Sequence, residues 1–404
     1  MKFIKSSLLI LFLVSCDDIG KGYQWKNSGF SSRFGTIGYD YGWNASYSPF
    51  DEGIIVVGQS SINIAGQSDM WAIKTDKDGL LKWKKRFGGG KNDVGYDVIA
   101  TSDGGFLFVG YTWSYGNNQQ VYIVKTDFHG NTEWQKTYGG SMWDVGNAVI
   151  EINGGGYLVA GYSNSPGISS GNTDMYLLRI NSNGELIWQS AYGNKAFPNH
   201  EWAQDLIETS DGEFIVVGMR DRYNKGALNG LIIRIDGLGS LLWEKEFGDE
   251  NQVSESIYSI SKAMDGNYYL CTSFNSINKP KVFQGKVLKM DSVGNVGWAR
   301  IINSNSREYH QFRASSTISG DVVIVGSSAQ QLPSGHKEDA FITKINNVGD
   351  ILWSYPYGSS DEDDWGWSIF ETPKSDLVFV GSTKSFGASL FDIYLVGTNA
   401  DGIR

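Results

Sequence analysis

Short apolar runs separated by turn residues repeat along almost the whole of this chain. Between Asp69 and Gly110 the strand-like segments are residues 70–74, 80–87, 95–100 and 106–109. Turn residues separate them, and no window shows the 3.6-residue apolar period of an amphipathic helix. The pattern therefore predicts units of four short antiparallel strands.

The tryptophans mark how regularly this unit recurs. Six of them lie 51 to 55 residues apart: Trp83, Trp134, Trp188, Trp243, Trp298 and Trp353. The fourth strands end at seven comparable positions: Gly58, Gly110, Gly161, Gly218, Thr272, Gly326 and Gly381. A four-stranded repeat of this length is typical of a propeller blade. We therefore predict an all-β, seven-bladed β-propeller with four antiparallel strands per blade.

The last copy of the unit is incomplete. It begins at Asp392 and stops at Arg404, two residues before the position of its tryptophan. We expect an N-terminal strand near Trp25 to close the last blade, because pairing removes two exposed strand edges. One spacing does not fit: Trp25 lies ten residues before Gly35, whereas other tryptophans lie five residues before the comparable glycine.

The first residues have the pattern of an export signal. Lys2 and Lys5 precede an apolar run at 8–14 that is too short to span a bilayer. The run ends in Leu-Val-Ser-Cys, which resembles the bacterial lipobox and implies that Cys16 becomes acylated, with palmitate among its lipids. We expect residues 1–15 to be a signal peptide, 16–22 a lipidated tether and 23–404 a single propeller. The alternative is an ordinary secretory signal with a chance cysteine.

The lipobox resemblance also implies a location. We expect a lipid-anchored protein of the cell envelope, on the outer membrane at its surface or its periplasmic face. Asp17-Asp18 leaves the membrane and the face open, because acids there resemble a surface-export signal in some bacteria and a retention signal in others.

Charge and cysteine content narrow the possible partners. The net charge of −10 becomes −12 once residues 1–15 and their two lysines are removed. Such a surface repels nucleic acid and anionic lipid, so no nucleic-acid partner is expected. With Cys16 acylated, Cys271 is left without a disulfide partner in the chain. We expect a monomer that is stabilised by packing.

A family resemblance supports the same fold. The phrase Asp/Asn-x-x-Gly-x-x-x-Trp resembles the tryptophan-docking repeat of PQQ-like propellers, and residues 174–188 are similar to propeller repeats of exported Bacteroidetes-type lipoproteins. The resemblance covers nearly all of 23–404 but does not imply one activity. The quinone enzymes use adjacent cysteines, which this chain lacks, so we expect no cofactor. A propeller lipoprotein that assists outer-membrane barrel assembly has eight blades, whereas we count seven here.

One acidic residue recurs in every unit, 17 or 18 residues before the end of the fourth strand. The members are Asp40, Asp93, Asp144, Glu201, Glu255, Glu308 and Asp364. We hypothesise that they ring one mouth of the central channel and bind a cation or a cationic ligand, with the metal unknown. The alternative is that each accepts backbone N–H bonds in its own loop.

Two further columns have a structural interpretation. The repeated tryptophans are expected to pack between adjacent blades. A basic column is expected to consist of solvated cations at strand ends: Lys74, Lys125, Arg179, Arg234, Lys289 and Lys344.

Loops that depart from the repeat are the candidates for ligand binding. Their chemically distinctive residues are Phe197, His200, Trp202, Trp365 and Trp367. Aromatic rings beside carboxylates suit sugars or cationic peptides, although loop drift is the simpler explanation.

The first functional hypothesis is a non-enzymatic, membrane-anchored binding scaffold for a protein or a glycan. The alternatives are a glycan-active hydrolase or lyase that uses channel-mouth carboxylates, and an outer-membrane assembly accessory. The repeated acids supply no asymmetric pair for acid/base chemistry, so no catalytic residue is assigned.

Overall fold

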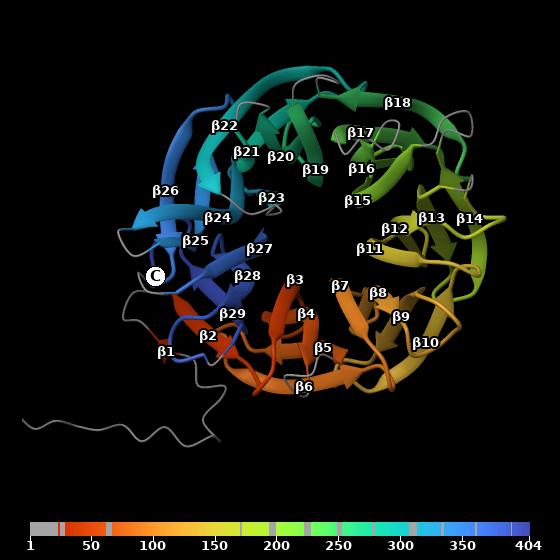
Figure 1. Cartoon of the computed structure of the whole chain (residues 1–404), viewed down its shortest axis with the longest axis horizontal. Helices are drawn as coiled ribbons and strands as arrows, with labels where there is room; N and C mark the ends of the chain where they lie inside the picture. Colours follow the sequence, from red (N-terminus) through yellow and green to blue (C-terminus); the bar gives the residue numbers. More distant parts are fainter. Residues whose placement is uncertain are drawn as a thin grey trace, which may run out of the picture.

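The computed structural model describes residues 23–24, 29–61, 67–169, 172–193, 199–221, 228–248, 253–276, 279–306, 313–332, 335–359, 362–388 and 390–404. These residues form seven antiparallel sheets arranged in a ring (Figure 1). No helix in this part of the chain is long and apolar enough to cross a membrane. The prediction of an all-β, seven-bladed propeller is confirmed.

Each blade is a four-stranded meander, listed here from the innermost strand outward. Blade 1 is β3 (Asp40–Ser48), β4 (Gly53–Ser61), β5 (Ser68–Thr75) and β6 (Leu81–Phe87). Blade 2 is β7 (Asp93–Ala100), β8 (Phe106–Thr112), β9 (Gln120–Thr126) and β10 (Thr132–Tyr138). Blade 3 is β11 (Asp144–Glu151), β12 (Tyr157–Ser163), β13 (Asp174–Ile180) and β14 (Leu186–Tyr192). Blade 4 is β15 (His200–Glu208), β16 (Phe214–Asp221), β17 (Leu228–Ile235) and β18 (Leu241–Phe247).

The remaining blades follow the same order. Blade 5 is β19 (Val253–Lys262), β20 (Tyr268–Ser276), β21 (Lys279–Met290) and β22 (Val296–Ser306). Blade 6 is β23 (Arg313–Ser316), β24 (Val322–Leu332), β25 (Gly335–Ile345) and β26 (Ile351–Tyr357). Blade 7 is β27 (Asp364–Glu371), β28 (Leu377–Thr383) and β29 (Asp392–Thr398), completed by β2 (Phe30–Phe34) and β1 (Tyr23–Gln24).

The repeat in the sequence is out of phase with the blades. Residues 70–74 and 80–87 belong to the outer strands β5 and β6 of blade 1, whereas 95–100 and 106–109 belong to the inner strands β7 and β8 of blade 2. A unit that begins at Asp69 therefore spans two blades. This offset is why the last blade needs a strand from the other end of the chain.

An N-terminal strand closes the ring, but it is not centred on Trp25, which lies outside the described residues. The outer strand of blade 7 is β2, in which Phe30 pairs with Gly397. Trp83 pairs with Lys74 at the same position in blade 1, so Phe30 occupies the tryptophan column. Phe30 lies five residues before Gly35, which resolves the spacing that did not fit.

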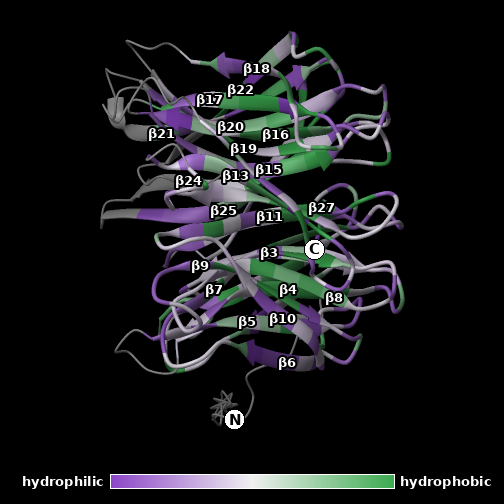
Figure 2. Cartoon of the chain, turned by 90° about the vertical axis from the view of Figure 1, so that its right-hand side faces the viewer, coloured by the Kyte–Doolittle hydropathy of each residue, from purple (hydrophilic) through white to green (hydrophobic). Residues whose placement is uncertain are grey.

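The hydrophobic core is divided among the junctions between blades. One cluster joins Val57 and Met70 of blade 1 to Phe106 and Phe108 of blade 2, and six others repeat this arrangement around the described ring. Both faces of a blade are therefore buried, which explains the continuous apolar runs of the inner strands. The predicted core position of Cys271 is confirmed, because its side chain is fully buried. Figure 2 shows the contrast with outer strands β6 and β18, which are hydrophilic.

The tryptophan column packs between blades, as predicted. The Trp83 indole Nε1 donates to the Phe128 carbonyl oxygen in the hairpin turn of blade 2, over 3.2 Å. The ring lies on Gly130 of that turn, where an added Cβ would approach it to 3.0 Å. Gly130 has a φ of 76°, so the turn needs glycine for its backbone as well as for the ring.

Candidate functional site

The acidic column lies at the start of the innermost strands and is buried. Asp40, Asp93, Asp144, Glu201 and Asp364 have no exposed surface, and Glu255 is 5% exposed. Glu308 lies outside the described residues.

The aspartates of this column each clamp two loops together. The Asp93 carboxylate accepts the Gly89 N–H at 2.8 Å and the Ser114 hydroxyl at 2.7 Å, as well as the Thr112 hydroxyl. Asp364 accepts the Ser359 N–H at 2.9 Å and the Ser385 hydroxyl at 2.7 Å in the same way. The loop that enters the inner strand is thereby fixed to the loop that leaves the second strand. This geometry supports the local hydrogen-bonding alternative for the described aspartates.

The glutamates of the column pair with cations instead. Arg220 Nε donates to Glu201 at 2.8 Å and the same guanidinium contacts Glu244 and Glu246, while Lys286 contacts Glu255 at 2.5 Å. Burial raises the pKa of Glu201 to about 7, and Arg220 opposes that shift. No group of three or more His, Cys, Asp or Glu side chains within the described ranges is placed to hold a metal ion. Cation binding at the column stays an alternative hypothesis that a calcium titration can test.

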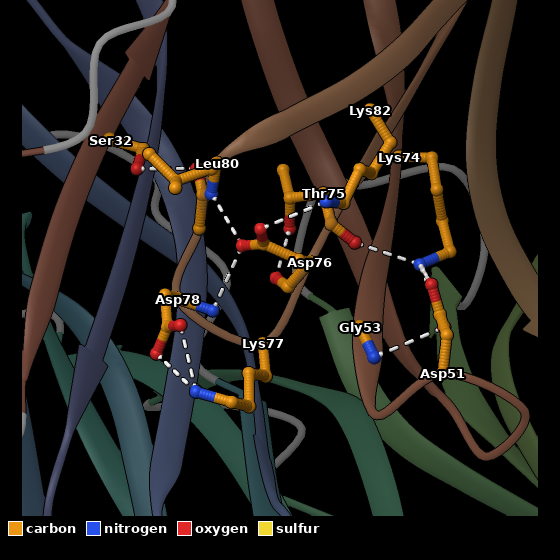
Figure 3. A network of polar contacts seen from close by, with 11 residues as sticks. Ser32, Asp51, Gly53, Lys74, Thr75, Asp76, Lys77, Asp78, Leu80 and Lys82 are labelled. Carbon is orange, nitrogen blue, oxygen red and sulfur yellow. Dashed lines mark hydrogen bonds and ion pairs between the residues drawn. The ribbon is translucent and has the colours of Figure 1, made fainter.

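The basic column is not solvated, contrary to expectation. Lys74 is 1% exposed, and its Nζ contacts Asp51 of the β3–β4 hairpin at 2.7 Å and the Thr75 carbonyl oxygen at 2.7 Å (Figure 3). Lys125 makes the same pair with Asp103 at 2.9 Å. The hairpin of the two inner strands folds over the third strand, so five of the six cations contact an acid of their own blade, whereas Arg179 donates to backbone carbonyl oxygens. Burial lowers the pKa of Lys74, and the pair with Asp51 opposes that shift.

A polar column that the sequence reasoning missed encircles the axis. In six blades the residue directly after the β-bulge of the inner strand stands opposite the same position of the second strand, and in blade 6 Arg313 at the start of β23 does so. These residues are Asn44, Asp97, Ala148, Asp205, Ser259, Arg313 and Ser368, of which all but Ala148 are polar. We call these seven residues the axial belt. The signal in the sequence is spacing, because each residue lies four or five positions after the acid of the same unit.

Members of the axial belt connect one blade to the next. Asp97 accepts the Val149 N–H of blade 3 at 2.8 Å and the Asn44 amide of blade 1 at 2.5 Å. Asp205 accepts the Ile260 N–H of blade 5 at 3.0 Å. Ser368 donates to Asn44, which lies 324 residues away in the sequence. The belt therefore joins blades across the closure of the ring.

The belt contains two carboxylates and one guanidinium. Burial raises the pKa of Asp97 to about 7, whereas Arg313 and the Val149 N–H oppose the shift. Burial also raises the pKa of Asp205, again opposed by Arg313. The three side chains come from blades 2, 4 and 6, so they converge on the axis from different directions.

Aromatic side chains gather on one side of the ring, where the inner strands begin. We call the residues Tyr39, Tyr41, Trp43, Tyr96, Trp365, Trp367 and Phe391 the aromatic arc. Tyr41 stacks on Tyr39 with 6.2 Å between ring centroids and 5° between planes, and on Trp365 with 6.5 Å and 8°. Trp365 in turn stacks on Phe391 at 4.2 Å. These contacts join blades 7 and 1.

A second tier of the arc lies deeper along the inner strands. Trp43 contacts Trp367 of blade 7 at 4.9 Å and Tyr96 of blade 2 at 5.9 Å. Each of these rings directly precedes a belt residue: Asn44, Ser368 and Asp97. Because the rings occupy the same position in successive inner strands, they line the axial side of blades 7, 1 and 2. At the equivalent position blades 3 and 4 carry Asn147 and Gln204, whereas blade 5 carries Tyr258, so the run of aromatic residues is interrupted at blades 3 and 4.

The loop residues predicted to bind ligand are separated by the fold. Trp365 and Trp367 belong to the aromatic arc, with Trp365 partly exposed and Trp367 buried. His200 and Trp202 stack on each other at 5.8 Å in blade 4, across the ring from the arc. Phe197 lies outside the described residues. The arc members Tyr39, Tyr41, Trp43 and Tyr96 were not foreseen as ligand residues, because in the sequence they sit within regular strands or next to them.

A cavity lies elsewhere, at the seam between blades 7 and 1 near the strand-connecting turns. It has a volume of about 360 Å³ and a floor that includes Phe30, Ile54 and Val378. It adjoins Gly397 and Phe30, which stand where other blades carry a basic residue and a tryptophan. The rim lysines Lys77 and Lys374 are paired with Asp78 and Glu52. The cavity forms because Phe30 and Gly397 are smaller than the tryptophan and the basic residue at these positions in the other blades.

Comparison with known proteins gives the fold and no family. No family model matches the chain, and no curated protein matches it. Sqt1 from Chaetomium thermophilum is similar in structure with a TM-score of 0.52 and 8% identity, covering 89% of this chain and 96% of that one. The periplasmic gluconolactonase PpgL from Pseudomonas aeruginosa has a TM-score of 0.51 and 13% identity, covering 78% and 86%. An α-L-arabinanase from Penicillium chrysogenum, complexed with arabinobiose, has a TM-score of 0.50 and 14% identity, covering 76% and 93%. At such low identity these similarities establish the β-propeller architecture and leave the function to be argued from the chain's own residues.

Proposed function

We propose that this protein is a binding scaffold whose aromatic arc takes a glycan. The observation that carries the proposal is the nearly parallel stack of Tyr39, Tyr41 and Trp365, in which Tyr39 is 38% exposed and the other two rings are partly exposed. A pyranose ring presents an apolar C–H face that packs on an aromatic face, while its hydroxyls need polar partners at the edge.

Polar groups are available at the edge of the arc. Lys384 lies over the Phe391 ring at 4.4 Å and contacts Asp363 at 3.3 Å, so one cation and one carboxylate border the rings. The belt residues Asn44 and Ser368 lie one position beyond the deeper rings. Aromatic faces bordered by a few polar groups are the usual composition of a ligand site.

The rest of the repeat holds this site rigid. Asp40 fixes the start of β3 by accepting the Thr36 N–H, and its own N–H donates to the Phe391 carbonyl oxygen at 2.8 Å. The loops that carry Tyr39 and Phe391 are thereby tied together. Rigid placement reduces the ordering cost of binding, which favours a scaffold for recognition. In this proposal acylation of Cys16 attaches the scaffold to the cell envelope, with the outer membrane as the expected site.

The test compares glycan binding by three proteins. Binding is screened on a glycan array and quantified by calorimetry for the wild type and for Tyr39→Ala/Trp365→Ala. Each stacking ring contributes roughly 0.5–1.5 kcal/mol to the binding free energy in addition to its buried area. Loss of two rings is therefore expected to weaken binding about tenfold to a hundredfold. Trp143→Ala is the control, because Trp143 is 50% exposed but lies outside the arc. The proposal is wrong if no glycan binds, or if the control weakens binding as much as the double variant.

Glycan cleavage is the second candidate, carried by the pair Asp97 and Asp205. Glycoside hydrolysis requires one protonated and one ionised carboxylate beside the scissile bond, and burial raises the pKa of both Asp97 and Asp205. Binding is preferred because both carboxylates already accept hydrogen bonds from two blades. Incubation of the bound glycan with the wild type and with Asp97→Asn separates the two candidates: product that the wild type releases and the variant does not would favour the enzyme.

A further inference from the structure

The outermost strand of blade 1 carries a charge pattern that the acidic chain as a whole does not predict. Strand β6 reads Leu-Lys-Trp-Lys-Lys-Arg-Phe, with four cations and no acid. By contrast, β18 of blade 4 reads Leu-Leu-Trp-Glu-Lys-Glu-Phe. We infer that this basic edge, formed by Lys82, Lys84, Lys85 and Arg86, rests against an anionic membrane surface.

Two of the four cations have no acid partner among the described residues. Lys82 contacts Asp76 at 3.2 Å, and Arg86 lies 4.0 Å from Asp69. Lys84 makes no ion pair there and lies over the Trp71 ring at 5.9 Å, and Lys85 likewise makes none. The basic edge therefore keeps a local positive excess that lies on the outer rim.

The net charge of −10 does not cancel this excess. At physiological ionic strength charges are screened beyond about 8 Å, so a surface in contact with β6 responds to the nearest cations and much less to acids across the ring. The repulsion expected for the chain as a whole thus does not hold at this edge.

The basic edge lies beside the strand that leads toward the proposed anchor. The Ser32 hydroxyl of β2 donates to the Gly79 carbonyl oxygen at 2.8 Å, directly before β6 begins, and β1 pairs with the outer side of β2. Figure 1 shows β1, β2 and β6 together on the same part of the rim. Six residues lie between Cys16 and Tyr23, and the seven steps from one to the other span at most about 25 Å when extended.

Because the segment between Cys16 and Tyr23 is this short, an anionic membrane is the partner we assign to the basic edge. The inference rests on the proposed acylation of Cys16, which would hold the rim of blades 7 and 1 close to the lipid headgroups. A basic patch is one of the features that strengthens the attachment of a lipid-anchored protein to a membrane. Each cation near an anionic bilayer adds attraction worth about a fivefold gain in partitioning. The edge would then supply a second contact beside the lipid.

The experiment isolates this contact from the lipid. Full-length chains that all carry Cys16→Ser are sedimented with phosphatidylcholine vesicles that contain or lack phosphatidylglycerol, at low and at physiological ionic strength. Lys84→Ala/Lys85→Ala is compared with Lys245→Ala/Lys262→Ala, a control that removes the same charge from blades 4 and 5. Every variant keeps the same first 15 residues, so their contribution to binding cancels.

We expect the Lys84/Lys85 variant to bind the anionic vesicles about 25-fold less than the control, with no difference on neutral vesicles. Equal binding of the two variants, or equal binding of the Cys16→Ser chain to both kinds of vesicle, overturns the inference. If soluble dextran sulfate binds the edge as tightly as the vesicles do, the partner is a polyanion in solution and the membrane assignment is wrong. If wild-type Cys16 does not incorporate labelled palmitate, the proposed anchor is wrong. If no glycan binds, the proposed role of the aromatic arc is wrong. Neither result alters the vesicle measurement.

Discussion

Phe30 closes the ring, and its replacement by alanine tests that role most directly. Phe30 is 6% exposed and packs against Gly79 of blade 1 and Gly397 of blade 7, in the column that tryptophan occupies elsewhere. A phenylalanine buries roughly 150–250 Å², and each Å² removed from water contributes about 25 cal/mol. After subtraction of the part that alanine retains, Phe30→Ala is expected to lower the free energy of unfolding by about 3 kcal/mol.

The assay is urea denaturation followed by tryptophan fluorescence and by circular dichroism. Phe386→Ala is the matched control, because Phe386 is 51% exposed and its truncation should cost less than about 0.5 kcal/mol. The denaturant slope of the variant should stay near the wild-type value if the ring unfolds as one unit. A loss for Phe30→Ala below about 1 kcal/mol, or a loss equal to that of Phe386→Ala, would refute the argument that β2 closes the ring through this side chain.

Three further predictions concern the buried charges. Asp51→Ala should lower the free energy of unfolding by about 2–3 kcal/mol, because Lys74 loses its carboxylate while it stays buried; Lys74→Met in the same chain should recover most of that loss, and a double-mutant cycle measures the difference. Asp339→Asn should stabilise the protein by about 1–2 kcal/mol above pH 6. Burial, with Asp364 and Asp363, raises the pKa of Asp339 from 3.8 to about 6, so its contribution to stability is complete below pH 4 and is lost as the pH rises through 6. Melting curves at pH 4 and pH 7 check the sign, and a larger gain at the lower pH would contradict it. Calcium titration should give no heat and no thermal shift, because the described members of the acidic column are buried and bonded within their blades; a saturable heat would restore the cation site.

The sequence predicted the architecture because its information is periodic and local. Apolar runs, turn residues and the spacing of the tryptophans each repeat, so seven blades could be counted without any contact being known. The same reasoning placed Cys271 in the core and the tryptophans between blades. The sequence reasoning placed Trp25 in the closing strand because Trp25 matches the repeat by residue type. The structure places Phe30 in the tryptophan column, and Phe30 matches the repeat by its distance from Gly35.

The tertiary structure decided which polar residues are exposed. Lys74 was expected to be solvated, and it is buried because a hairpin from the inner strands folds over it and supplies Asp51. The aspartates of the acidic column could equally have faced a channel or a loop, and the spacing along the chain is the same in both cases. Exposure depends on neighbours that the repeat pattern does not specify.

The aromatic arc and the axial belt exist only once the ring is closed. Trp365 meets Tyr41, and Ser368 meets Asn44, across the junction between the last blade and the first. A pattern read along the chain ranks these residues as ordinary strand positions, because the partners lie hundreds of residues apart. The sequence by itself determined the blades and their number. The closure of the ring determined how the aromatic arc and the axial belt continue from blade 7 to blade 1. Only at this junction do residues from the two ends of the chain come within contact distance.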